Sequence, residues 1–233
     1  MKIISNTDKS KLNISALRIL EESILNILKN KNHLTLGISG GRGVTELFKL
    51  MGNSTNIPWN LVHIFTVDER CVPITHEDSN YKLANDLFIN RLTDKGLLPK
   101  INVHPFSYNE LLNDFGVSNY NQQLRNLGGK LDLIIIGMGD DGHIASLFPH
   151  HDSIKNEDEF FISIKNSPKP PPSRMSSSKK LLMNTHTSLL LSFGTSKQNA
   201  FSNFKNDSLS VYDCPAKIIK SIPNSYIFTD LEL

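Results

Sequence analysis

The fold is decided by one stretch of the chain, Leu131-Asp132-Leu133-Ile134-Ile135-Ile136-Gly137-Met138-Gly139-Asp140-Asp141-Gly142-His143. Its first half, residues 131–136, is the longest apolar run in the sequence and is interrupted only by one aspartate. An apolar run of this length that ends in glycine is typical of a buried strand. We therefore expect a strand over 131–136, followed by a turn that presents two acids and a histidine.

The same order, a strand and then a polar turn, recurs on both sides of this stretch. Apolar runs at 34–38, 61–67 and 188–193 end in polar turns at 39–43, 68–70 and 194. Apolar residues at helical spacing predict helices over 11–29, from 44, over 79–92 and over 196–204. This alternation predicts an α/β fold: a three-layer, Rossmann-like and mostly parallel sheet with helices on both faces. Ligands bind at the carboxyl ends of such strands, so we expect the polar turns to share one crevice.

The length of 233 residues suits one large α/β domain or two small ones. The proline-rich segment 167–174, Ser-Pro-Lys-Pro-Pro-Pro-Ser-Arg, fits either an interdomain linker or a rigid loop. Because the residues after it still show a strand–helix–strand pattern, we interpret residues 1–233 as a single domain that contains a rigid loop.

Several classes of protein do not fit this composition. No segment approaches the ~18 apolar residues that a membrane helix requires, and the N-terminus lacks the apolar core of a secretory signal. A net charge of +2 without a basic run gives nucleic acid little electrostatic reason to bind. Two cysteines, Cys71 and Cys214, fit no metal-binding spacing and indicate a reducing environment. We expect a cytoplasmic protein that binds no metal, no nucleic acid and no membrane.

The turn Gly37-Ile38-Ser39-Gly40-Gly41 matches two motifs. As a glycine-rich loop between a strand and a helix, it exposes backbone N–H groups suited to a phosphate. As Gly-x-Ser-x-Gly, it also matches the nucleophile elbow of serine hydrolases, and a tight turn without a ligand is the third possibility. Arg42, which follows directly, suits an anion, so phosphate binding is the favoured interpretation.

The cluster Asp68-Glu69-Arg70 follows the expected strand over 61–67. Adjacent side chains on an extended strand point to opposite sides, so only one of the two acids can face the crevice. Arg70 could neutralise either acid, and taken alone the cluster would be a surface ion pair of little energetic value.

The turn 137–143 is the most informative part of the sequence. Its glycines allow close backbone approach, and Asp141 stands two residues before His143, where it could orient the imidazole or bind a substrate hydroxyl. Histidine has a reference pKa of ~6.5 and can act as a general base at neutral pH. The carboxylates at 140 and 141 would repel a pyrophosphate, so we interpret the turn as catalytic and not as a cofactor loop.

Two further cations stand close to expected turns. Arg174 follows the proline-rich segment and Lys197 follows Gly194. Either one alone is more often a solvated surface charge, but together with the turn 39–43 they would complete a clamp for a phosphate. The remaining histidines, including the pair His150-His151, have no spacing that requires a metal.

Together these motifs resemble the 6-phosphogluconolactonase family, in order and over nearly the whole chain. The resemblance rests on Ser39-Gly40-Gly41-Arg42, Val67-Asp68-Glu69-Arg70-Cys71-Val72-Pro73, Asp78-Ser79-Asn80-Tyr81, residues 137–149, residues 167–174 and Gly194-Thr195-Ser196-Lys197. The wider superfamily includes glucosamine-6-phosphate deaminase, which shares the first turn, an Asp-Glu pair and the histidine turn. The ending Ser146-Leu147-Phe148-Pro149 and the proline-rich segment resemble the lactonase branch.

The resemblance implies a fold like that of glucosamine-6-phosphate deaminase and ribose-5-phosphate isomerase. It also implies hydrolysis of 6-phospho-D-glucono-1,5-lactone in the oxidative pentose phosphate pathway, without metal or cofactor, by a monomer or small homo-oligomer. His143 would deprotonate the attacking water, and Asp68 and Asp141 would hold sugar hydroxyls or orient His143.

The remaining expected site residues would bind the substrate. Backbone N–H groups of the glycine turns, with Arg70, would stabilise the oxyanion. The 6-phosphate would be held by the turn Ser39-Gly40-Gly41 and by three cations, Arg42, Arg174 and Lys197.

Three other functions stay open at this stage. The first is a deaminase or isomerase of the same fold, although no acid occupies the place where deaminases carry one. The second is a sugar-phosphate-binding module without turnover; related modules accompany a helix-turn-helix, and the residues before 34 hold only one clear helix. The third is a serine esterase that uses Ser39.

The chain departs from the family pattern after Arg174. There it reads Met175-Ser176-Ser177-Ser178-Lys179-Lys180, where the family has an apolar, threonine-rich strand. We expect this strand to be short or to lie at a sheet edge.

Overall fold

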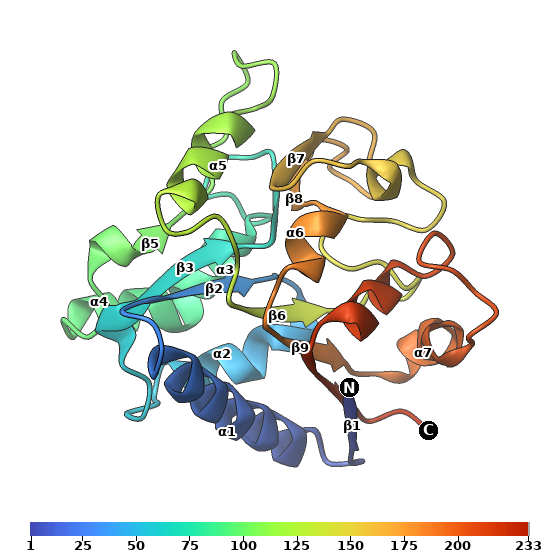
Figure 1. The fold of residues 1–233 in the computed structure, drawn as a ribbon, viewed down its shortest axis with the longest axis horizontal. Helices are drawn as coiled ribbons and strands as arrows, with labels where there is room; N and C mark the ends of the chain where they lie inside the picture. Colours follow the sequence, from blue (N-terminus) through green and yellow to red (C-terminus); the bar gives the residue numbers. More distant parts are fainter. Residues whose placement is uncertain (233) are drawn as a thin grey trace.

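The computed structural model describes residues 1–232, which form one parallel sheet of seven strands and a smaller antiparallel sheet (Figure 1). The order of the main sheet is β1-β10-β9-β6-β2-β3-β5, and all neighbours in it are parallel. Its strands are β1 (Lys2–Ser5), β2 (Leu34–Ile38), β3 (Val62–Thr66), β5 (Val103–His104), β6 (Leu133–Gly137), β9 (Thr187–Ser192) and β10 (Asn224–Thr229).

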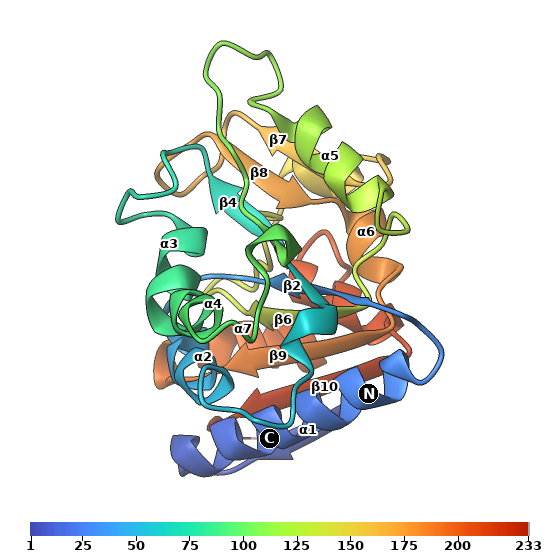
Figure 2. The same cartoon turned by 90° about the vertical axis from the view of Figure 1, so that its left-hand side faces the viewer.

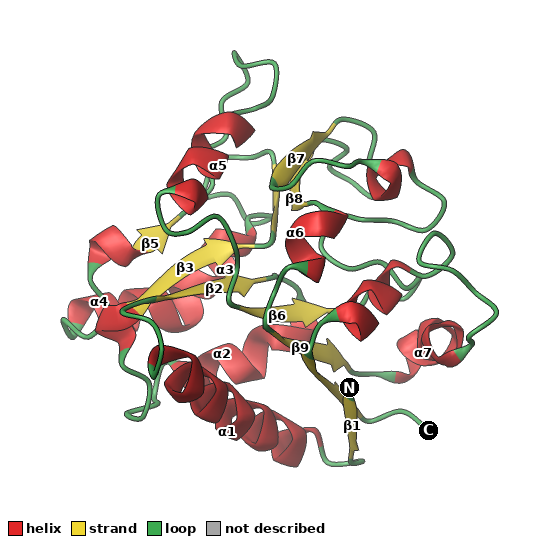
Figure 3. Ribbon diagram, in the orientation of Figure 1, coloured by secondary structure: helices red, strands yellow, loops and turns green. Residues whose placement is uncertain are grey.

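Helices cover both faces of the main sheet (Figure 3). One face packs against α1 (Lys9–Leu28), α2 (Thr45–Met51), α3 (Asn80–Ala84) and α4 (Asn90–Asp94), the last two joined by a π-helical turn, Asn85–Ile89. The other face packs against α5 (Val117–Arg125), α6 (Lys179–Met183) and α7 (Gln198–Lys205). None of the helices within residues 1–232 combines the length and the apolar character needed to cross a membrane.

The central strand β6 shows why the sheet has two covered faces. Ile134 and Ile136 belong to one apolar cluster, whereas Leu133 and Ile135 belong to the cluster on the opposite face. All four side chains are fully buried, and each such burial stabilises the fold by about 1.5–3 kcal/mol. The expected three-layer α/β arrangement is therefore confirmed, with the strand predicted at 131–136 at its centre.

The residues before 34 hold a strand, β1, in addition to the one helix that was expected there. Strand β1 pairs with β10 at the edge of the main sheet. Its four residues are mostly exposed, so the sequence there carries no apolar run that would mark a strand. The helix expected over 11–29 follows it as α1, which Asp8 caps by accepting from the backbone N–H groups of Ser10 and Lys11.

The small sheet consists of β4 (Asp68–Arg70), β8 (Arg174–Ser177) and β7 (Phe161–Ile164), in that order. In Figure 2 it lies above the main sheet, on the side opposite α1. Strand β8 is short, as expected, but it is the central strand and not an edge. Serines can fill this buried place because their hydroxyls are satisfied: Ser177 Oγ donates to the carbonyl of Val67 at 2.8 Å.

Three histidines lie against one another on the β3–β5 side of the main sheet. His63 Nδ1 is 3.0 Å from His104 Nε2, and the rings of His33 and His63 have centroids 5.5 Å apart. Burial, together with the charges that His104 and His33 would carry, lowers the pKa of His63 to about 4. His63 is therefore neutral at pH 7.

We expect His63 to make the fold less stable as the pH falls from about 6.5 to about 4. In this window the unfolded chain binds a proton at His63 that the folded chain does not, so acid favours unfolding. In His63→Gln the fall in Tm across the window should be shallower than in the wild type. His150→Gln, at a side chain that is 64% exposed, is the control, and an unchanged slope in His63→Gln would contradict the prediction.

Candidate active site

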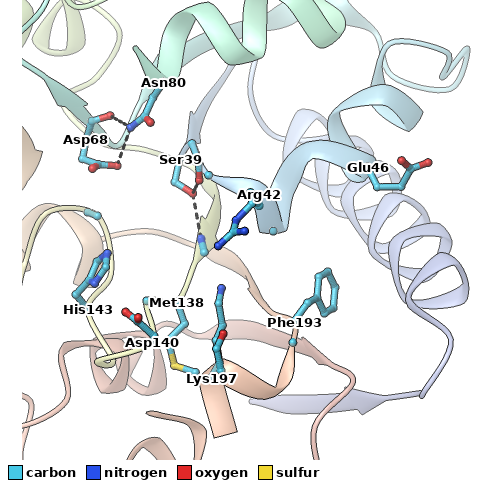
Figure 4. A pocket seen from close by; sticks show the side chains of 18 of the residues that line it. Ser39, Arg42, Glu46, Asp68, Asn80, Met138, Asp140, His143, Phe193 and Lys197 are labelled. Carbon is cyan, nitrogen blue, oxygen red and sulfur yellow. Dashed lines mark hydrogen bonds between the residues drawn. The ribbon is translucent and has the colours of Figure 1, made fainter. Parts of the chain in front are cut away.

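The expected crevice is a pocket of about 690 Å³ at the carboxyl ends of β2, β6 and β9 (Figure 4). The turns after these strands line it, and so do Asp68 and Arg70 from β4 and Arg174 from β8. Of the ten residues predicted for the site, only Asp141 does not line the pocket. The sheet has thus brought together side chains that are up to 158 positions apart in the sequence, since both Ser39 and Lys197 contribute.

His143 is held by Asp141 in the orientation that a general base needs. Its Nδ1 lies 2.5 Å from Asp141 Oδ1, and its backbone N–H donates to the same oxygen at 3.1 Å. The ring of Phe148 packs on the imidazole, with centroids 4.6 Å apart. Since the carboxylate accepts the proton on Nδ1, the neutral imidazole presents an unprotonated Nε2, which has no hydrogen-bond partner within residues 1–232.

Asp141 stays ionised even though it is partly buried. Burial by itself would raise its pKa, but the hydrogen bond with His143, the charge of that histidine and the hydrogen bond from Lys169 bring the pKa below its ordinary value. Lys169 Nζ lies 3.1 Å from Asp141 Oδ2 and 2.6 Å from Asp140 Oδ1. The sequence analysis gave Lys169 no role.

Glycine is required at position 139 because the side chains of His143 and Asp141 occupy the space beside it. A Cβ atom there would lie 2.1 Å from His143 Nδ1 and 2.6 Å from Asp141 Oδ1. The backbone N–H of Gly139 also donates to the carbonyl of His143 at 2.8 Å, which closes the turn. The glycine-rich character of the turn thus serves the close packing of the histidine on its own backbone.

Only one acid of the pair after β3 faces the pocket, as expected. Asp68 lines it, and its Oδ2 accepts from Ser146 Oγ at 2.8 Å. Glu69 points away and accepts from the backbone N–H groups of Asn80 and Tyr81, at 2.7 and 2.8 Å, in the first turn of α3. Glu69 does not line the pocket, and its hydrogen bonds hold the start of α3; burial raises its pKa.

Asn80 and Arg70 complete this side of the pocket. Asn80 Nδ2 donates to the backbone carbonyl of Asp68 at 2.9 Å, which fixes the strand that carries the acid (Figure 4). Among the described residues Arg70 forms an ion pair with neither Asp68 nor Glu69; its guanidinium donates to the carbonyl of Asp78. It is therefore available to a ligand as a cation.

The turn after β2 has the shape of an anion-binding loop. Gly41 has φ +94°, and a Cβ at Gly40 would lie 1.9 Å from Asn80 Oδ1, so both positions require glycine. Ser39 Oγ accepts from the backbone N–H of Gly137 at 3.0 Å, which ties this turn to the end of β6. Within residues 1–232 the hydrogen bonds of Ser39 Oγ are with the N–H of Gly137 and the carbonyl of Gly40, and none is with a histidine.

Arg42 and Lys197 extend into the same part of the pocket from the turns that follow β2 and β9 (Figure 4). Lys197 Nζ is 3.8 Å from the place of a Cβ on Gly43, the residue after Arg42. Burial lowers the pKa of Lys197, and the positive charge of Arg42 acts in the same direction. A partly buried lysine beside an arginine in one pocket favours a doubly charged anion such as a phosphate.

Arg174 lines the pocket, but most of its hydrogen bonds go to the proline-rich loop. It is 4% exposed, and its Nε donates to the carbonyl of Pro171 at 2.8 Å. Its Nη2 donates to the carbonyls of Pro170 at 2.8 Å and Lys169 at 3.2 Å. The guanidinium thus holds the loop in place, and the binding of a phosphate by Arg174 stays a prediction.

The pocket also contains residues that the sequence analysis missed: Lys9, Ser10, Asn13, Glu46 and Phe193. They come from α1, α2 and the end of β9, where ordinary helix and strand patterns give no sign of a site. No group of three His, Cys, Asp or Glu side chains within residues 1–232 is arranged to hold a metal ion.

Comparisons with known proteins identify the family to which this sequence is similar. The sequence pattern of glucosamine-6-phosphate isomerases/6-phosphogluconolactonase matches residues 7–227. The chain is 35% identical over 208 residues to a 6-phosphogluconolactonase of Borreliella burgdorferi, which covers 89% of this chain and 88% of the relative.

Solved structures share the fold. The 6-phosphogluconolactonase of Thermotoga maritima superposes with a TM-score of 0.83 at 22% identity, over 99% of this chain and 98% of the other. The enzyme of that name from Trypanosoma cruzi gives a TM-score of 0.82 at 20% identity, over 98% and 94% of the two chains. The match over residues 7–227 and the identity to the Borreliella relative show that the chain belongs to the family of glucosamine-6-phosphate isomerases and 6-phosphogluconolactonases.

Proposed function

We propose that the protein hydrolyses the ring ester of 6-phospho-D-glucono-1,5-lactone to give 6-phospho-D-gluconate. The observation that carries the proposal is the presence, in one pocket, of a histidine with a free Nε2 and a pair of cations, Arg42 and Lys197. The name and the 35% identity of the Borreliella relative support the same substrate. A lactone is a reactive ester, so a positioned base and water are sufficient without a covalent intermediate.

The reaction begins when His143 Nε2 takes a proton from a water molecule whose oxygen attacks the lactone carbonyl carbon. The oxyanion that forms is stabilised by backbone N–H groups of the glycine turns and by Arg70. The bond between the carbonyl carbon and the ring oxygen then breaks, and the imidazolium returns the proton to the departing oxygen. Asp141 remains ionised throughout and stabilises the imidazolium.

The substrate is positioned by groups at the two ends of the pocket. The 6-phosphate binds to Arg42, Lys197 and the N–H groups of the turn after Ser39. Asp68 accepts a hydrogen bond from a sugar hydroxyl, which turns the carbonyl toward His143. Arg174 contributes through the loop that it shapes.

Residues 1–233 act as one α/β domain in this reaction. The two cations proposed to bind the phosphate, Arg42 and Lys197, come from the N-terminal and C-terminal parts of the chain and line one pocket. It also assumes a cytoplasmic setting, which the two buried free thiols, Cys71 and Cys214, support.

The test is hydrolysis of freshly generated lactone, followed as acid release and corrected for the spontaneous reaction. We expect turnover well above this background. Glucono-1,5-lactone, which lacks the phosphate, should be a poor substrate, and glucosamine 6-phosphate should release no ammonia. Lactone hydrolysis at the background rate would overturn the proposal, and ammonia release would support a deaminase in its place.

A further inference from the structure

The proline-rich loop, residues 167–174, reaches the catalytic pair through one side chain, Lys169. Its ammonium bridges the two acids of the histidine turn, at 2.6 Å from Asp140 Oδ1 and 3.1 Å from Asp141 Oδ2. Asp141 uses its other oxygen, Oδ1, for His143. Lys169, Asp141 and His143 thus form a chain of hydrogen bonds that ends at the imidazole.

The backbone of the loop is fixed independently of this contact. Three of its carbonyls, those of residues 169, 170 and 171, accept hydrogen bonds from the buried guanidinium of Arg174. The backbone N–H of Ser167 donates to the carbonyl of Pro172 at 2.9 Å and closes the base of the loop. The loop therefore presents Lys169 from a rigid support, and four prolines reduce its freedom further.

The charge of Lys169 acts on Asp141 and Asp140 at short range. The two acids adjoin in sequence and repel each other, and without Lys169 only the two hydrogen bonds from His143 to Oδ1 would hold the side chain of Asp141. Because the side chain of Lys169 is 39% exposed, the interaction serves orientation more than stability.

We infer that Lys169 is a positioning residue for the reaction. Its loop holds Lys169 in place, and Lys169 keeps the carboxylate of Asp141 hydrogen-bonded to Nδ1 of His143. This inference rests on the proposed lactone hydrolysis. Lys169 itself lies outside the set of residues that line the pocket, so it acts through Asp141 and not through contact with the substrate.

The experiment compares Lys169→Met with Lys169→Arg, using freshly generated 6-phosphogluconolactone. We expect Lys169→Met to lower kcat about tenfold with KM within about twofold, because a misplaced base slows the chemical step alone. Lys169→Arg should restore kcat, since a guanidinium can bridge two carboxylates.

Lys165→Met is the matched control. Lys165 lies just before the loop, and its ammonium packs over the ring of Phe115 at 5.4 Å, so this variant should behave as the wild type. A rise in KM with unchanged kcat in Lys169→Met would overturn the inference in favour of a direct substrate contact. Unchanged kcat and KM would also overturn it. A wild type that fails to hydrolyse the lactone overturns the proposed function instead, so the two failures are distinguishable.

Discussion

Replacing His143 with asparagine is expected to lower kcat for lactone hydrolysis by about 10²–10⁴-fold, while KM stays within about twofold. Asparagine keeps a polar group that can donate to Asp141, but it offers no nitrogen that can take a proton from water. The phosphate-binding end of the pocket is untouched, so the substrate still binds. The measurement is the initial rate of acid release from freshly generated lactone, with the spontaneous rate subtracted.

His150→Asn is the matched control for this experiment. His150 lies seven positions further along the chain, is 64% exposed at its side chain and is absent from the pocket lining. Its variant should keep the kcat of the wild type. A His143→Asn protein that keeps more than about a tenth of the wild-type kcat would show that another group acts as the base.

Replacing Lys197 with methionine is expected to raise KM for the phosphorylated lactone by about 10- to 100-fold and to change kcat less. The aliphatic part of the side chain is conserved, and only the charge that faces the phosphate is lost. Arg42 remains in the pocket and retains part of the binding. The measurement is the dependence of the hydrolysis rate on lactone concentration.

The substrate without a phosphate separates charge recognition from general damage. Glucono-1,5-lactone cannot use the cation, so Lys197→Met should hydrolyse it at the same low rate as the wild type. Lys205→Met, at the end of α7, the helix that begins directly after Lys197, changes an ammonium that packs over the ring of Phe201 and should leave both substrates unaffected. Equal losses for the two lactones in Lys197→Met would show that Lys197 supports the fold and not the phosphate.

The parts of the fold that could be predicted are those where an apolar run meets a glycine turn. The runs at 34–38 and 131–136 become β2 and β6, because a strand buried on both faces has to be apolar along its whole length. The turns that follow them lie in one pocket because parallel strands end on the same side of a sheet.

Strands β1 and β8 and the role of Lys169 could not be predicted, because contacts between distant parts of the chain determine them. Strand β1 exists through its pairing with β10, and its own side chains are mostly exposed. Strand β8 is rich in serine, and the hydroxyl of Ser177 becomes satisfied only beside Val67. The role of Lys169 depends on contacts across 28 positions of sequence, between 141 and 169, which no local pattern encodes.

The order β9-β6-β2 has a consequence for how this scaffold can change in evolution. The cations proposed to bind the phosphate, Arg42 and Lys197, stand after the two outer strands, whereas His143, the proposed base, follows the strand between them. Neighbouring strands lie about 4.8 Å apart, so the ends of the two outer strands are about 10 Å apart whatever side chains follow them. Mutations confined to the turn after β6 can therefore change the reaction without altering Arg42 and Lys197, the residues proposed to bind the phosphate.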